Sequence, residues 1–165
     1  LQIDFLCEIA KKCKDYNIHT AIDTAGYVPW ESFERIMPYT DLFLYDIKAF
    51  HKDIHRKFVG VPNELILHNL SKLLERKANV TVRIPVIPTV NDSMEEMKNI
   101  RNFLAPYELA AVELLPYHKM GEHKYAALGM QLTSFRIPSR EKMKELNDFF
   151  QQPEPAQEKS HEPAL

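Results

Sequence analysis

The stretches TAIDTAGY at residues 20–27 and LFLYDIK at residues 42–48 decide the fold class of this sequence. In each, a short apolar run ends in an acid, Asp23 or Asp46, and the second run adds Lys48 two residues later. We expect both runs to be strands that are buried on both faces and turn polar where a parallel α/β barrel places its active site. The two acids are therefore predicted to form the floor of a binding site.

Helical and strand patterns alternate along the rest of the chain. Helical spacing, capping residues, prolines and glycines predict helices over residues 4–16, 29–37, 51–58, 64–77, 93–104 and 139–150. Short apolar runs predict strands over residues 18–22, 41–47, 80–87 and 111–115, the third broken by Pro85 and Pro88, and a long polar loop follows to about Pro138. This alternation predicts an α/β fold with a parallel sheet and right-handed crossovers.

Four βα units do not close an eight-stranded barrel, so the sheet is either open or part of a barrel. The chain begins on LQIDF, without methionine and directly in a helical pattern, which favours part of a barrel. We expect one domain over residues 1–150. The tail over 151–165, rich in proline, glutamate and glutamine, is expected to be disordered.

Composition excludes several classes of partner. The chain has 165 residues, with 21 basic against 23 acidic side chains and a net charge of −2, so no electrostatic case exists for nucleic acid or an anionic membrane. No apolar run approaches the roughly 20 residues that span a bilayer, and no signal peptide is recognisable. A cytoplasmic location is expected.

The cysteines and two of the histidines form weak metal-site patterns. Cys7 and Cys13 lie six residues apart in a helical pattern, about 240° apart around the axis, so they are predicted to be free, buried or half-buried thiols. His51 and His55 have the spacing of a helical metal pair but lack a third ligand and are flanked by basic residues. A solvated surface is the favoured interpretation for these histidines.

Polar residues gather where the four predicted strands end. They are Asp23 and Thr24 after the first strand, Asp46 and Lys48 after the second, Arg83 within the third, His118 after the fourth, and Glu113, which is expected to point inward. The carboxyl ends of parallel strands meet at one edge, where ligands bind. Such a set can coordinate a cation through its acids and hold a carboxylate or hydroxyl groups through its bases.

Each of these residues also has an ordinary structural interpretation. Asp23 can cap a helix, Lys48 can extend to solvent, and His118 can be a polar histidine without a catalytic role. Arg83 can be the buried ion-pair partner of Glu113. The site is favoured because four consecutive strands each place a polar group at the same end.

Five ordered motifs resemble the glycyl-radical enzyme activating enzymes, a family of radical S-adenosylmethionine oxidoreductases whose best-known member is the pyruvate formate-lyase activating enzyme. They are DTAG at 23–26, LYDIK at 44–48, VGVPN at 59–63 together with His55, RIPVIP at 83–88 and LLPYH at 114–118. The resemblance covers residues 1 to about 150. It implies a partial (β/α)6 barrel of which this chain is similar to the carboxyl-terminal four βα units.

The resemblance also implies cofactors and roles. Family members cleave S-adenosylmethionine with a 4Fe–4S cluster, take an electron from flavodoxin or ferredoxin, and abstract hydrogen from a backbone glycine of a partner glycyl-radical enzyme. The side chains of Asp23, Thr24 and Asp46 and the carbonyl of Leu44 resemble a monovalent cation site. The residues that resemble contacts to S-adenosylmethionine are Lys48, Arg83 and His118.

This sequence departs from the family pattern in several places. The C-x3-C-x2-C cluster loop and the Gly-Gly-Glu stretch that binds the methionine amino group are absent, so no cluster is expected in this chain, and the fragment alone is expected to be inactive. Ala25 stands where asparagine is commonest. The segment from His118 to Gly129 resembles the place where the glycine-bearing loop docks. The PWE stretch at 29–31 and the RIPVIP motif resemble activating enzymes of dehydratases, decarboxylases and C–N lyases.

Two alternatives come from other functional classes. Lys48 at a strand end can form a Schiff base in an aldolase-like barrel enzyme, although Asp46 on the same strand argues against it. The chain can also be a non-catalytic fragment that binds a partner, or associates with itself, through the exposed barrel edge.

Overall fold

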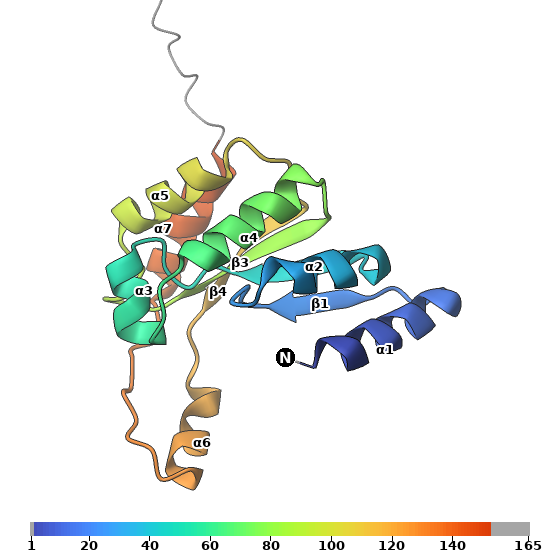
Figure 1. The fold of residues 1–165 in the computed structure, drawn as a ribbon. Coiled ribbons are helices and arrows are strands. Elements are labelled where there is room, and N and C mark those ends of the chain that lie inside the picture. The colour runs from blue at the N-terminus through green and yellow to red at the C-terminus, as the bar shows by residue number, and fades with distance from the viewer. Residues whose placement is uncertain (1, 153–165) are drawn as a thin grey trace, which may run out of the picture.

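A computed structural model of the protein describes residues 2–152, in which helices alternate with four strands (Figure 1). The elements are α1 (Ile3–Asp15), β1 (Ala21–Thr24), α2 (Trp30–Ile36), the 3-10 turn η1 (Met37–Tyr39), β2 (Leu42–Asp46), α3 (Lys52–Val59), α4 (Glu64–Glu75), β3 (Val80–Val86), α5 (Met94–Leu104), β4 (Ala111–Pro116), the 3-10 turn η2 (Lys119–Gly121), α6 (Glu122–Ala127) and α7 (Arg140–Gln151). Beyond Gln152, the tail expected to be disordered lies outside the described residues.

The four strands form one parallel sheet in the order β1-β2-β3-β4. Ala21 pairs with Leu42, Phe43 with Val80, and Thr81 with Ala111. Each strand therefore lies beside the next strand along the chain, which confirms the predicted α/β class and is the arrangement of consecutive units in a partial barrel. All four carboxyl ends lie at the same edge of the sheet.

The two faces of the sheet differ. Phe43, Tyr45 and Ile47 are buried and pack in one core with helix residues that include Phe33 and Leu70. The alternate positions on β2 are only partly buried, and β1 and β4 also expose residues on that face. The expectation that the two strands with the acidic ends are buried on both faces is wrong for β1 and β2, because within residues 2–152 the core with the helices forms on one face only.

Two strands differ from the prediction by more than a terminal residue: β1 in its bounds, and β3 in its continuity through Pro85. β1 begins at Ala21, because Asn17 leaves α1 with a φ of 55° and Thr20 donates its N–H to Asp41 before the ladder starts. Asp23 and Thr24 thus belong to the strand rather than to a loop. β3 continues through Pro85, since β2 ends opposite Arg83 and Pro85 pairs only with β4. The missing N–H of the proline therefore interrupts no bond to β2.

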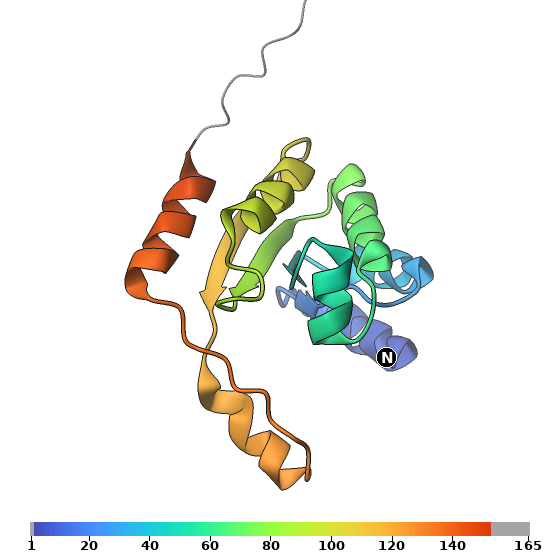
Figure 2. The ribbon, with the colours of Figure 1, turned by 90° about the vertical axis from the view of Figure 1, so that its left-hand side faces the viewer.

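The segment predicted as a long polar loop after β4 contains η2 and α6. Together with the chain that returns to α7, this segment forms an arm, residues 117–139, which projects from the carboxyl edge of the sheet (Figures 1 and 2). Helix α7 packs back against β4 and α5, and its Leu146 is fully buried.

None of the helices in the described part of the chain is long and apolar enough to cross a membrane. Cys7 and Cys13 are free and half-buried, as predicted.

Candidate functional site

Four of the predicted site residues meet in one ionic network at the carboxyl ends of β1, β2 and β3. Arg83 Nη2 lies 2.6 Å from Asp23 Oδ1 and 2.8 Å from Asp46 Oδ1. Its Nε also donates to Asp46 Oδ1 at 2.9 Å, and Lys48 Nζ donates to Asp46 Oδ2 at 3.0 Å. Because two acids face two bases, the network is electrically balanced.

Burial within this network is uneven. The side chains of Arg83 and Asp46 are 16% and 15% exposed, whereas those of Lys48 and Asp23 are 36% and 65% exposed. Partial burial alone would lower the pKa of the Arg83 guanidinium, but its hydrogen bonds to Asp23 and Asp46 outweigh that effect and raise the pKa above its ordinary value. Arg83 is therefore a permanent cation at the centre of the site.

The residues predicted to hold a monovalent cation lie near one another, with Arg83 among them. Asp23 is opposite Leu44 in the β1–β2 register. Thr24 Oγ1 accepts a hydrogen bond from the Gly26 N–H at 3.0 Å. The Arg83 guanidinium bridges the two carboxylates of the predicted cation site, so the cation itself remains a prediction.

The pairing of Arg83 with Glu113 is wrong. Glu113 is opposite Arg83 in the strand register but is exposed, and the Arg83 guanidinium bonds to Asp23 and Asp46 instead.

The turn after β1 is packed tightly against the core. Gly26 has a φ of 75°, and a Cβ at this position would lie 1.8 Å from the Tyr45 hydroxyl. That hydroxyl is buried and donates to the Ile66 carbonyl at 2.7 Å. Asn69 donates to the carbonyls of Gly26 and Val28 at 2.9 and 2.8 Å. These contacts fix the turn that follows Asp23 and Thr24.

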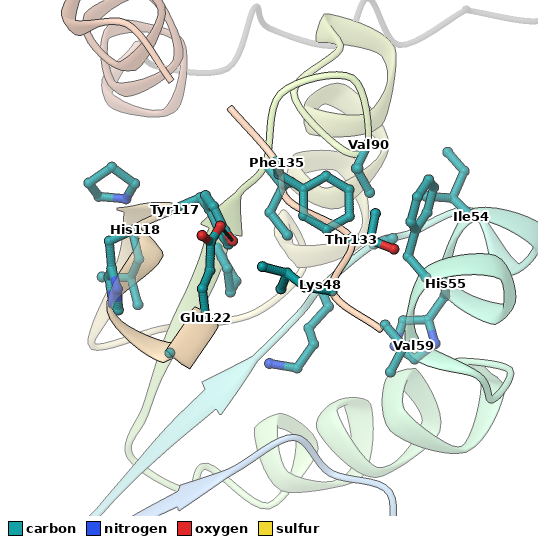
Figure 3. A pocket seen from close by; sticks show the side chains of 18 of the residues that line it. Lys48, Ile54, His55, Val59, Val90, Tyr117, His118, Glu122, Thr133 and Phe135 are labelled. Atoms are coloured by element: carbon teal, nitrogen blue, oxygen red, sulfur yellow. Dashed lines mark hydrogen bonds between the residues drawn. The ribbon is translucent and has the colours of Figure 1, made fainter. Parts of the chain in front are cut away.

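A cavity of about 490 Å³ lies beside Lys48 (Figure 3). Its walls are largely apolar and come from α3, the ends of β3 and β4, and the arm; they include Ile54, Phe58, Tyr117, Leu132 and Phe135. Lys48 and His118 both line it, so Lys48 belongs to the cavity and to the ionic network at once. The structure thus brings His118 to the same cavity as Lys48, although His118 is exposed and makes none of the network's ion pairs.

Three buried polar side chains that the sequence analysis did not single out hold the β2 loop, residues 47–51, which carries Lys48. Asn63, Asn91 and Glu96 are 2%, 0% and 1% exposed, and all three form hydrogen bonds to this loop. The motif Asn91-Asp92-Ser93 predicts only a helix start, and Ser93 is indeed the cap of α5. Glu96 three residues after Ser93 has the spacing of a capping box, which predicts a bond back to the Ser93 N–H, so no local signal in the sequence predicted its contact with the β2 loop.

The two histidines at the start of α3 lie in different environments. His55 is buried and its Nδ1 donates to the Val61 carbonyl at 2.7 Å, so the surface interpretation is wrong for this residue. His51 is half-exposed and bonds to Glu96. Across residues 2–152, no three His, Cys, Asp or Glu side chains come together as metal ligands.

Comparison with known proteins places this geometry in a family. The model of the radical SAM superfamily matches residues 1–104. The chain is 44% identical over 153 residues to the trans-4-hydroxy-L-proline dehydratase activating enzyme of Clostridioides difficile, covering 90% of this chain and 51% of that protein. It is 42% identical over 135 residues to the choline trimethylamine-lyase activating enzyme of Oleidesulfovibrio alaskensis, covering 79% of this chain and 44% of that protein.

A solved structure agrees with these relatives. A domain of pyruvate-formate lyase-activating enzyme from Bacteroides vulgatus superposes with a TM-score of 0.76 at 31% identity, covering 90% of this chain and 84% of that domain. The chain spans about half the length of the curated relatives that it matches. It belongs to the radical SAM superfamily and, within it, to the activating enzymes that include the pyruvate-formate lyase-activating enzyme.

Proposed function

We propose that the protein activates a glycyl-radical enzyme by abstracting hydrogen from a backbone glycine, and that this chain supplies four βα units of its partial barrel. The observation that carries the proposal is the balanced network of Asp23, Asp46, Arg83 and Lys48 beside a cavity at the carboxyl edge of a radical SAM sheet. Charged groups that converge on a cavity at this edge are the usual setting for a polar ligand.

The network fits the amino-acid end of S-adenosylmethionine. Lys48 and Arg83 offer donors for its carboxylate, and His118, on the same cavity as Lys48, offers a donor for the ribose hydroxyls. Asp23, Thr24, Asp46 and the Leu44 carbonyl offer oxygen ligands for a monovalent cation, which would compete with Arg83 for the two carboxylates. If bound here and reductively cleaved with an electron delivered by a part of the protein outside residues 2–152, S-adenosylmethionine would supply the one-electron chemistry that removes the glycine hydrogen.

The described residues do not fit a 4Fe–4S cluster, because Cys7 and Cys13 lie in one helix six residues apart and no ligand group forms. We therefore assign the cluster to a part of the longer protein outside residues 2–152. An electron donor such as flavodoxin or ferredoxin and a cytoplasmic location belong to this proposal.

The partner is proposed to be a protein. The names of the relatives describe activating enzymes of a dehydratase, a lyase and a decarboxylase, which are themselves enzymes. The arm, which contributes one wall of the cavity, exposes Met120, Leu128 and Met130. Exposed apolar side chains beside a cavity suit a protein loop better than a small solute.

Calorimetric titration of the full-length protein with S-adenosylmethionine tests the proposal. We expect Asp23→Ala and Asp46→Ala to weaken binding and to weaken its dependence on potassium, because each removes a predicted ligand. Arg35→Ala, which removes an exposed ion pair with Asp4, is the control. Unchanged binding in both site variants would overturn the assignment of this site.

The Schiff-base alternative is less well supported. Lys48 donates to the Asp46 carboxylate at 3.0 Å and its side chain is 36% exposed, whereas a Schiff-base lysine is desolvated and lies away from an acid. Borohydride reduction in the presence of carbonyl compounds should therefore leave Lys48 unmodified, as judged by mass spectrometry.

A further inference from the structure

The backbone of the β2 loop is bonded by side chains from outside it. Asn91 Nδ2 donates to the Lys48 carbonyl at 2.8 Å. Asn63 Nδ2 donates to the carbonyls of Ala49 and Phe50 at 3.0 and 2.6 Å. Glu96 Oε1 accepts the N–H groups of Phe50 and His51, the latter at 3.1 Å. Buried loop peptides seldom find so many side-chain partners, because most buried backbone groups bond to other backbone groups.

Glu96 is diverted from its usual partner. In a capping box the serine accepts from the N–H of the glutamate, and the glutamate accepts from the N–H of the serine. Here the first half is present, since Ser93 Oγ accepts from the Glu96 N–H at 3.1 Å. The carboxylate instead reaches the β2 loop and lies 2.6 Å from His51 Nδ1. Glu96, in the first turn of α5, therefore fixes the loop after β2.

Asn91 joins the loop after β2 to the end of β3. Its Nδ2 donates to the Pro85 carbonyl at 2.6 Å as well as to Lys48, and its Oδ1 accepts the Ile87 N–H at 2.7 Å. The amide is fully buried, so each of these bonds would be costly to lose. Through them the Lys48 backbone is held against the strand that carries Arg83.

We propose that Asn91 and Glu96 are positioning residues for Lys48: by fixing the backbone of residues 48–51, they present its ammonium between Asp46 and the cavity. A lysine side chain has about 2 kcal/mol of rotamer entropy, so its placement depends strongly on where its Cα is held. A preorganised loop reduces the ordering that a ligand must pay for. The part of this inference that concerns S-adenosylmethionine rests on the proposed function, whereas the placement of Lys48 does not.

The first test measures Lys48 alone. Trace reductive methylation of the 165-residue chain, read by peptide mass spectrometry, reports how freely each lysine amine reacts, with the exposed Lys11 as internal reference. Asn91→Asp keeps the acceptor for the Ile87 N–H but removes the donors to Lys48 and Pro85. We expect it to raise Lys48 labelling about 3- to 10-fold, the factor that corresponds to one or two lost hydrogen bonds.

Two further variants separate positioning from stability. Glu96→Gln keeps an acceptor for the loop N–H groups but loses the charge beside His51, so its labelling should lie between wild type and Asn91→Asp. Ser93→Ala removes the cap of the same helix, including the bond to the Glu96 N–H, but leaves every side-chain bond to the loop in place, so it should lower stability and leave Lys48 labelling close to that of wild type. Equal labelling in Ser93→Ala and Glu96→Gln, or wild-type labelling in a folded Asn91→Asp, would overturn the proposal. If Asn91→Asp does not fold, the comparison of Glu96→Gln with Ser93→Ala decides.

The second test measures ligand affinity. Titration of the full-length protein with S-adenosylmethionine should show about 3- to 10-fold weaker binding in Asn91→Asp, and wild-type binding in Ser93→Ala. Equal affinity in Asn91→Asp and wild type would show that the position of the β2 loop does not affect the binding of S-adenosylmethionine. If wild type binds no S-adenosylmethionine but the labelling pattern holds, the proposed function fails and the positioning of Lys48 stands.

Discussion

The β2 loop and the arm after β4 both carry residues predicted to contact S-adenosylmethionine, and the protein holds them in opposite ways. The loop with Lys48 is bonded by three buried polar side chains from the starts of α4 and α5. The arm with His118 exposes Met120, Leu128 and Met130, which are 76%, 73% and 56% exposed. One region is fixed by the fold, and the other is left open to solvent.

This difference fits the two kinds of molecule that the proposed function requires. A small charged ligand gains affinity from donors that are already in place. A protein partner instead buries apolar surface, which must be exposed before it binds. Packing therefore separates the part of the site suited to a cofactor from the part suited to a partner.

The largest effect is expected from Gly26→Ala. A Cβ here would overlap the buried Tyr45 hydroxyl, and the φ of 75° adds strain. We expect the free energy of unfolding in urea to fall by about 3–5 kcal/mol. Gly60→Ala is the matched control, since it has a φ of 91° but no neighbour within 4 Å, and it should cost about 1–2 kcal/mol. Equal losses would mean that strain alone, and not packing on Tyr45, fixes the turn.

A smaller loss is expected from Arg83→Met. This change leaves Asp46, which is 15% exposed, with Lys48 as its remaining cation, so the free energy of unfolding should fall by about 2–3 kcal/mol. Arg35→Met breaks an ion pair whose partner Asp4 is 88% exposed, and it should change stability by less than about 0.5 kcal/mol. A loss in Arg83→Met no larger than in Arg35→Met would contradict the fixed character of the network.

The β2 loop and the arm should also differ in how much each contributes to the affinity for S-adenosylmethionine. In the full-length protein, Lys48→Met should weaken binding of S-adenosylmethionine about tenfold, because the lost donor is held in place by its loop. His118→Ala should weaken it only about two- to threefold, since His118 lies exposed on the arm. Calorimetric titration measures both, and a larger loss for His118→Ala would reverse the assignment of the two regions.

The smallest effect is expected on the arm itself. Leu128→Ser replaces a side chain that is 73% exposed, so the free energy of unfolding should change by less than about 0.5 kcal/mol. Leu146→Ser on α7, where the side chain is fully buried, should cost at least about 3 kcal/mol. Urea unfolding of both variants gives the comparison. A large loss for Leu128→Ser would show that the arm contributes to the fold of the whole domain.

Much of this organisation was predictable from local patterns. Runs such as LFLYDIK combine β-forming residues with an abrupt polar end, so Asp46 and Lys48 were assigned to the correct end of a strand. Gly60 and Ser93 mark helix ends through backbone conformation and capping, which depend on neighbouring residues alone. The start of β1 was misplaced because the strand begins where its partner β2 begins, and pairing between distant segments leaves no local signal.

The sequence by itself determined the α/β class, the order of the elements and the polar strand ends, because periodicity and capping act within a few residues along the chain. Only the tertiary structure decided that Arg83 bonds to Asp23 and Asp46 rather than to Glu113, since Asp46 and Glu113 are both opposite Arg83 in register and only the folded sheet shows which carboxylates the guanidinium reaches. It also decided that Asn91 and Glu96 serve the loop of Lys48. These contacts join residues 43 to 46 positions apart, and only folding brings such residues within hydrogen-bond distance.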